Sequence, residues 1–357
     1  MQCLKMVLDT FKYTRTITKS LYAANVRLSN QRRNIFNRHL EEISRIKKNN
    51  SNSYQWKNPS RTTFFVISGS FLFNLFKPKE ERERDDIEEL TMTIKRSILL
   101  IQKQEFPKAE QMLHIALRQA QTLQHYDGIT YIYDIMANLA YDLNDFKKAE
   151  TLFKFVLSRL LAKKVPEDDL SVIHISLKIA DIYDKTGDTK KAESGYKFCL
   201  EHLQNHLAKD SENVDVLQLL GLTLEKYATM LFTKSQYTNA LNYFTQAYDI
   251  SVKINGEANE QSVILLNDLG SVSHMLQKYD QAIGYLSKAA EFGKKLPDMG
   301  DLGSIYVNLG NALIAKGLYE EAEKRCKEGE RLAKARDDKE SINEAKKCLQ
   351  QIKDLTS

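Results

Sequence analysis

Residues 263–295 read VILLNDLGSVSHMLQKYDQAIGYLSKAAEFGKK, and this stretch decides the fold. Its first half is apolar and carries a small residue, Gly270, directly after Leu269. Its second half begins with Tyr279, three residues before Ala282, and Ala289 follows seven residues later. Small side chains let two antiparallel helices approach closely where they cross. The stretch therefore predicts a helical hairpin.

The same pattern recurs along most of the chain. The alanine of the second helix recurs as Ala109, Ala149, Ala192, Ala240, Ala282 and Ala322, and all but Ala192 have an aromatic residue three positions earlier. The small residue of the first helix recurs as Ala137, Ala180, Ala228, Gly270 and Gly310. Self-similarity at such a period is typical of stacked repeats. We predict six helix pairs that start near residues 90, 130, 173, 221, 263 and 303.

This arrangement resembles the tetratricopeptide repeat, which implies an all-α, right-handed solenoid over residues 90–337. The residues expected in the turn within a pair tolerate a tight reversal: Asn144, Gly187, Ser235 and Gly317. The repeats here exceed the usual length of about 34 residues, so we expect longer loops or longer second helices. Residues 338–357 predict a capping helix and tail that cover the last apolar face.

The charge of the chain is concentrated at its beginning. Residues 1–61 hold 13 Lys or Arg and three acids, whereas the whole 357-residue chain has a net charge of only +5. A basic arm with interleaved Ser and Thr predicts a mitochondrial targeting leader, disordered or cleaved. The alternative is a disordered basic tail that meets nucleic acid or anionic lipid. For the repeats themselves we expect no nucleic-acid partner.

An uncharged stretch follows the leader. Residues 62–76 read TTFFVISGSFLFNLF and end at Lys77, which as a helix would span roughly 22 Å against a hydrocarbon core of about 30 Å. We interpret residues 62–77 as a possible membrane anchor, and the alternative is a buried segment packed on the repeats. The charged residues 78–89 predict a helical linker, with the domain boundary beside it.

The sequence offers little catalytic chemistry. No GxxxxGK[ST], GxSxG or HExxH motif occurs, and His202 and His206 lie four residues apart without a third ligand nearby. Four cysteines form no CxxC pair, so we expect reduced thiols at Cys3, Cys199, Cys326 and Cys348. We predict a binding scaffold with no metal, no cofactor and no enzymatic activity.

Three stretches carry a closer resemblance: ITYIYDIMANLA at 129–140, ISLKIA at 175–180 with Ile182 and Tyr183, and GYKFC at 195–199. They are similar to the mitochondrial tetratricopeptide repeat protein 19 family, and the similarity covers about three-quarters of the chain. The resemblance implies residence at the mitochondrial inner membrane. It also implies a role in keeping respiratory complex III intact, by clearing N-terminal fragments of the Rieske iron–sulfur subunit.

Two rival binding functions remain. A cytosolic peptide adaptor similar to the kinesin light chain predicts an unprocessed N-terminus, whereas the basic leader predicts cleavage. A clamp for a C-terminal carboxylate needs a Lys-x-x-x-Asn pair on a first helix. The corresponding pairs, among them Thr91/Lys95 and Ser304/Asn308, do not supply it.

The expected peptide groove follows from the repeat register. Residues one, four, eight and eleven places after the start of a first helix should face the concave surface. The candidate site residues are Tyr131, Asp134, Asn138, Tyr141, His174, Asp181, Asp184, Glu225 and Phe232, with Leu177, Leu222 and Thr229 between them. Four acids without Lys or Arg suit a basic amphipathic peptide, although solvated carboxylates are the simpler interpretation. Docking could instead use the outer face or the long loop expected from His206 to Val216.

Overall fold

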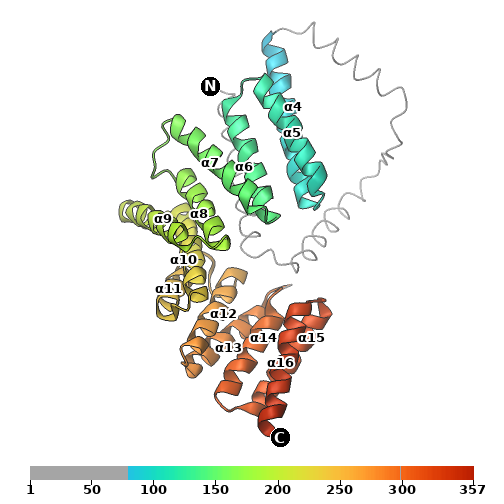
Figure 1. The fold of residues 1–357 in the computed structure, drawn as a ribbon, viewed down its shortest axis with the longest axis vertical. Helices are drawn as coiled ribbons and strands as arrows, with labels where there is room; N and C mark the ends of the chain where they lie inside the picture. Colours follow the sequence, from blue (N-terminus) through green and yellow to red (C-terminus); the bar gives the residue numbers. More distant parts are fainter. Residues whose placement is uncertain (1–78, 298) are drawn as a thin grey trace, which may run out of the picture. The chain divides into compact units, whose positions relative to one another are not determined.

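The computed structural model describes residues 79–297 and 299–357, and within these ranges the chain forms helices and no strand (Figure 1). The predicted all-α solenoid of repeats is confirmed there. The predictions for the leader at 1–61 and the segment at 62–77 lie outside the described residues. In chain order the helices are α4 (Lys79–Gln102), α5 (Phe106–Thr122), α6 (Tyr126–Asp142), α7 (Phe146–Ala162), α8 (Leu170–Lys185), α9 (Thr189–Lys209), α10 (Val214–Thr233), α11 (Tyr237–Asn255), α12 (Glu260–Met275), α13 (Tyr279–Lys295), α14 (Leu302–Ala315), α15 (Tyr319–Ala335) and α16 (Lys339–Thr356).

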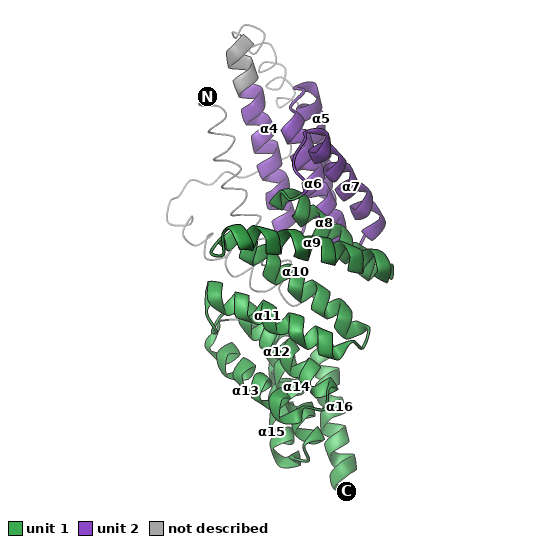
Figure 2. Cartoon of the chain, turned by 90° about the vertical axis from the view of Figure 1, so that its left-hand side faces the viewer, with its two compact units in different colours: residues 1–38, 168–357 green, residues 39–167 purple. Residues whose placement is uncertain are grey.

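The chain divides into two compact units, coloured separately in Figure 2. Of the described residues, unit 2 holds α4 to α7 and unit 1 holds α8 to α16. Within unit 2, α4 pairs with α5 and α6 pairs with α7. Within unit 1 the pairs are α8 with α9, α10 with α11, α12 with α13 and α14 with α15, and α16 packs on both α14 and α15. These are the six expected helix pairs and the capping helix.

Each turn within a pair has one residue in the left-handed backbone region. The expected turn residues Asn144, Gly187, Ser235 and Gly317 have φ of 60°, 87°, 59° and 80°. The residue after each of them donates its N–H to a carbonyl in the last turn of the first helix, as Asp145 does to Ala140 at 2.9 Å. This closure satisfies carbonyls that the helix end would leave without partners. In the first and fifth pairs this residue is Gln104 and Gln277, at φ of 60° and 59°, and glutamine is not a typical turn residue.

The repeat alanines lie where two helices cross. Ala109, Ala149, Ala192, Ala240, Ala282 and Ala322 are all fully buried, as the hairpin pattern predicts. In the sixth pair the helices approach so closely that a Cβ on Gly310 would collide with Cys326 Sγ. Only a residue without a side chain fits at that crossing.

The added length of the third repeat lies in its helices. The prediction of a long loop from His206 to Val216 is wrong, because α9 continues to Lys209 and α10 begins at Val214. Helix α9 has 21 residues, whereas α5, α7, α13 and α15 each have 17. The extra length of the third repeat therefore comes from a longer second helix, which was the other alternative that the sequence left open.

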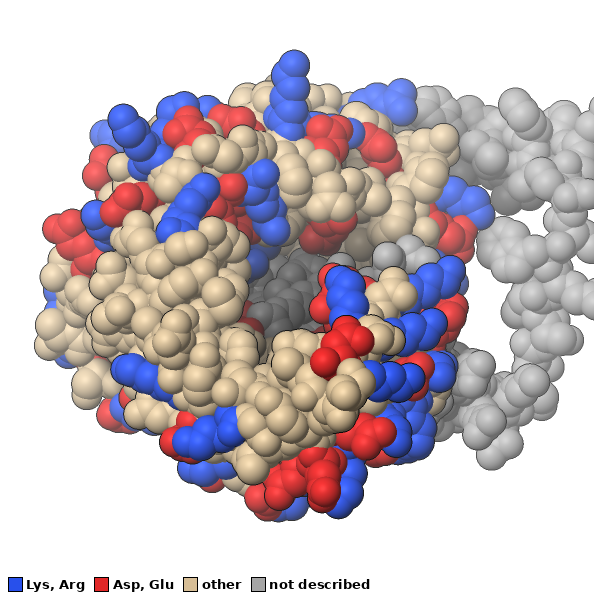
Figure 3. Space-filling model, turned by 60° about the horizontal axis from the view of Figure 1, so that its bottom comes forward, with Lys and Arg blue, Asp and Glu red and all other residues tan. Residues whose placement is uncertain are grey.

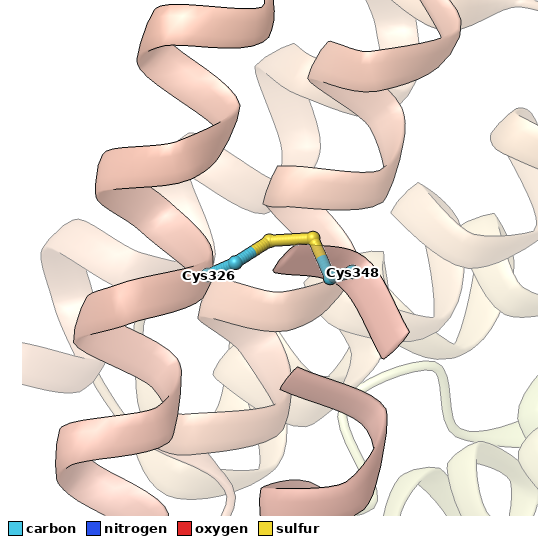
Figure 4. Close-up of a disulfide and its surroundings, with 2 residues drawn as sticks. All are labelled: Cys326 and Cys348. Atoms are coloured by element: carbon cyan, nitrogen blue, oxygen red, sulfur yellow. A yellow bond between two sulfur atoms is a disulfide. The ribbon is translucent and has the colours of Figure 1, made fainter. Parts of the chain in front are cut away.

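Two cysteines correct the prediction of reduced thiols. Cys326 on α15 and Cys348 on α16 form a disulfide, with Cα atoms 6.2 Å apart (Figure 4). They are 22 residues apart on consecutive helices, so only the packing of α16 on α15 reveals the pairing. Cys199 is free and buried, and burial raises the pKa of its thiol to about 12. Cys3 lies outside the described residues.

Candidate functional site

The first helices of the pairs carry the residues predicted to bind a peptide. In unit 2 these are Tyr131, Asp134, Asn138 and Tyr141 on α6, all half-buried. The Asn138 amide donates to the Asp134 backbone carbonyl at 2.8 Å, and the Tyr141 ring lies edge-on to Phe146 with ring centres 6.0 Å apart. The structure therefore brings these four residues together on one helix, partly open to solvent.

In unit 1 the predicted acids on α8 differ in their surroundings. Asp181 is only 5% exposed, accepts a hydrogen bond from the Tyr196 hydroxyl at 3.4 Å and lies 3.7 Å from Lys226 Nζ on α10. Asp184 is half-buried. Its pKa is raised, first by burial and then by the nearby charge of Asp181. The two carboxylates thus lie close enough to repel each other.

The predicted residues on α10 are held by neighbouring helices. Glu225 is 4% exposed and accepts a hydrogen bond from the Gln261 amide on α12 at 2.6 Å. Phe232 packs edge-on against Tyr237 with ring centres 5.5 Å apart. On α8, burial and the charge of Lys178 lower the pKa of His174 to about 3, so its imidazole is neutral at physiological pH.

The expectation that no Lys or Arg lines this surface is wrong for unit 1. Lys226 meets Asp181, and Lys234, Lys185 and Lys226 all act electrostatically on Asp184. Lys226 is not at one of the four positions used to choose groove residues, because it lies one residue after Glu225. Its long side chain still reaches Asp181 on the neighbouring first helix, α8. On the face shown in Figure 3, basic and acidic side chains are interspersed with a broad uncharged surface.

The histidine pair considered for metal binding has other contacts. His202 packs on Phe198 with ring centres 4.4 Å apart, and His206 Nε2 lies 2.6 Å from the Asp168 carbonyl oxygen. Over residues 79–297 and 299–357, no group of three or more His, Cys, Asp or Glu side chains is placed to hold a metal ion.

A pocket that the candidate residues did not include lies between α12, α14 and α16, with a volume of about 350 Å³. It is lined by His274 from α12, by Asn311, Ile314 and Ala315 from α14, and by Glu344, Lys347, Cys348 and Gln351 from α16. Some of these residues occupy the same helix positions that were used to choose the groove residues. His274 lies eleven places after the fifth start at 263, and Asn311 and Ile314 lie eight and eleven places after the sixth at 303. We call this site the C-terminal pocket.

The comparisons with known proteins agree with this architecture. Two models described as tetratricopeptide repeat match residues 219–295 and 303–328. Among solved structures, the apo form of RapI has a TM-score of 0.53 at 19% identity, covering 61% of this chain and 74% of that chain. The Cut9–Hcn1 hetero-tetramer has a TM-score of 0.51 at 14% identity, covering 76% of this chain and 44% of that chain. At such identities these likenesses concern the fold alone.

The helix pairs and the matching models define a tetratricopeptide repeat protein. The mitochondrial tetratricopeptide repeat protein 19 homolog of Drosophila melanogaster is 39% identical over 290 residues, which cover 81% of this chain and 79% of that protein. Its Homo sapiens counterpart is 30% identical over 274 residues, covering 74% and 72%. The chain belongs to the tetratricopeptide repeat protein 19 family. In the part of the chain that the structure describes, none of the helices combines the length and apolar character needed to cross a bilayer.

Proposed function

We propose that this chain is a non-enzymatic mitochondrial scaffold that supports respiratory complex III. In this role it binds basic N-terminal fragments of the Rieske iron–sulfur subunit and assists their clearance. Membership of a family whose relatives are named mitochondrial supports the location. A fold built of stacked helix pairs supports a binding role, because such repeats present extended surfaces to partners.

The observation that carries the proposal is the environment of Asp184. Its pKa is raised, first by burial and then by Asp181, and the opposing effect of Lys234, Lys185 and Lys226 does not cancel this rise, so the ionised carboxylate carries a net penalty in the free protein. A Lys or Arg of a bound peptide placed beside Asp184 would relieve that repulsion and favour the ionised carboxylate. In unit 2, half-buried Asp134 on α6 is a separate candidate acid. Phe232, also in unit 1, adds aromatic surface on which a basic side chain can rest.

The binding surface is tested with Asp184→Lys and Asp134→Lys in the full chain. The matched control is Asp249→Lys, which makes the same charge change at an exposed position on the second helix α11. The probe is a synthetic basic amphipathic peptide with the sequence of the Rieske leader. We expect each groove variant to bind it about tenfold more weakly at low salt, with the difference shrinking as salt screens the charges.

The control variant should keep the affinity of the parent protein. In mitochondria that contain only the Asp184→Lys variant, Rieske fragments should accumulate. Equal affinity of the parent and both groove variants, with folding intact, would overturn the proposed surface.

For location, we propose that residues 1–61 direct import and that residues 62–77 attach the protein to the inner membrane. A fusion of residues 1–61 to a reporter should enter mitochondria and become shorter on import. An unprocessed cytosolic fusion would instead favour a cytosolic peptide adaptor similar to the kinesin light chain. Carbonate extraction of mitochondria then distinguishes an anchored protein, which stays in the membrane pellet, from a detached one.

A further inference from the structure

The C-terminal pocket carries no net charge. Its two charged lining residues, Glu344 and Lys347, form an ion pair with each other at 2.7 Å. Burial lowers the pKa of His274 below its usual value, so this imidazole is neutral at physiological pH. A charged ligand group would lose its hydration here without gaining an opposite charge. The pocket therefore favours an uncharged group.

One side of the pocket is apolar. Ile314 and Cys348 are buried, and the sulfur of Cys348 is held in the disulfide to Cys326. At about 350 Å³ the pocket falls near the lower end of the usual range for ligand sites, about 300–1,000 Å³. This size and lining suit one large apolar side chain better than a whole metabolite.

Two amide side chains stand at the same pocket. Asn311 comes from α14 and Gln351 from α16, and among the described residues neither amide makes a hydrogen bond to the protein. Each amide offers both donors and an acceptor, which is the set that pairs with the N–H and C=O of an extended peptide. By contrast, the neighbouring Asn308 amide is already bonded to Asn267 Oδ1 at 2.9 Å.

The pocket also lies on the surface expected to face a peptide. His274 lies eleven places after the start of its repeat, as Asp184 does on α8. Asn311 lies eight places after the start of its repeat, as Asp181 does. All of these helices belong to unit 1. A peptide bound along the first helices of this unit therefore meets acids at one end and this neutral pocket toward the other.

We propose that the C-terminal pocket is a subsite for one large uncharged side chain, of leucine or an aromatic residue, from an extended peptide. Asn311 and Gln351 hold the peptide backbone on either side of that residue. The inference rests on the proposed function, because it adds a second recognition element to the same peptide ligand. The acids select a basic peptide, and the C-terminal pocket adds a requirement for one apolar anchor residue within it.

The first test fills the pocket from its open side. Ala315 is an exposed lining residue at the end of α14, so Ala315→Leu occupies the pocket without disturbing the core. The matched control is Ala208→Leu, at an exposed position on α9. We expect Ala315→Leu to bind the Rieske leader peptide about tenfold more weakly, since burial of one large apolar side chain is lost. Ala208→Leu should bind it like the parent protein.

The second test does not depend on that peptide. N-acetyl-phenylalanine amide and N-acetyl-aspartate amide are titrated into the full chain while NMR follows the side-chain amide signals of Asn311 and Gln351. The neutral compound should shift both signals, the acidic one should not, and Ala315→Leu should abolish the shift. Absence of any shift with the neutral compound would overturn the pocket. If the neutral compound binds while Asp184→Lys leaves peptide affinity unchanged, the pocket stands and the proposed acidic surface fails.

Discussion

Breaking the Cys326–Cys348 disulfide should release the capping helix and leave the rest of unit 1 folded. The bond closes a loop of 22 residues, and the chain-entropy relation assigns a closure of that length about 3 kcal/mol of stabilisation. Among the described helices α16 is the last of the stack, and it packs chiefly on α14 and α15. In a repeat array each element is stabilised chiefly by its neighbours, so the loss should stay near the end of the chain.

The assay is amide hydrogen exchange of the full chain with and without a thiol reductant, with intact mass confirming the redox state. Exchange should accelerate over α16 by about a hundredfold, as about 3 kcal/mol implies, more weakly over α15 and not over α8. The double variant Cys326→Ala/Cys348→Ala is the matched control. It should resemble the reduced protein and show no further response to reductant.

Three outcomes would contradict this reasoning. Uniform acceleration across unit 1 would mean that the capping helix is coupled to the whole stack. Unchanged exchange over α16 on reduction would mean that packing alone fixes the helix. Alkylation of Cys326 and Cys348 themselves, located by peptide mapping after denaturation of the untreated protein without reductant, would mean that the bond does not form.

Three further predictions concern packing, backbone and pH. Ala240→Leu overfills the buried crossing of α10 and α11, so the free energy of unfolding should fall by about 1–3 kcal/mol, and an unchanged thermal melt would show that the register is wrong. Gly317→Val places a β-branched residue at φ 80°, where no neighbour lies within 4 Å, so chemical denaturation should show a loss of about 1–2 kcal/mol from the backbone alone. The pKa of His174 is about 3 in the folded protein, against about 6.5 when unfolded. As pH falls below 6.5 only the unfolded state binds this proton, so stability should drop by up to about 1.4 kcal/mol per pH unit, and His174→Gln should flatten that slope in urea titrations at pH 7 and pH 5.

The repeat architecture could be predicted because each helix pair repeats one steric requirement. Ala149 and Ala282 are fully buried at their crossings, where a larger side chain would overfill the contact, so the same small residue recurs in the sequence. The turns at Gly187 and Gly317 could also be predicted, because glycine is favoured at positions that need the left-handed backbone conformation. The turns at Gln104 and Gln277 could not be predicted, because glutamine has no preference for the left-handed region that it adopts there.

The features that the sequence did not reveal depend on contacts between consecutive helices. The disulfide joins residues whose spacing resembles no cysteine motif, and only the position of α16 brings the two sulfurs together. Lys226 meets Asp181 from the next first helix, outside the register used to choose groove residues. The C-terminal pocket needs walls from α12, α14 and α16 at once, and a pattern within one repeat cannot indicate their combined shape.

Three polar contacts join consecutive first helices in unit 1, and they limit how its acids can act. Asp181 meets Lys226 across α8 and α10, Glu225 accepts from Gln261 across α10 and α12, and Asn267 accepts from Asn308 across α12 and α14. Removing one partner of such a buried contact leaves the other unsatisfied, which costs about 1–3 kcal/mol or more. Asp181 and Glu225 therefore set the spacing of the helices before they meet any ligand. Of the three predicted acids in this unit, we therefore expect half-buried Asp184 to bind a cationic peptide without weakening the packing of the helices.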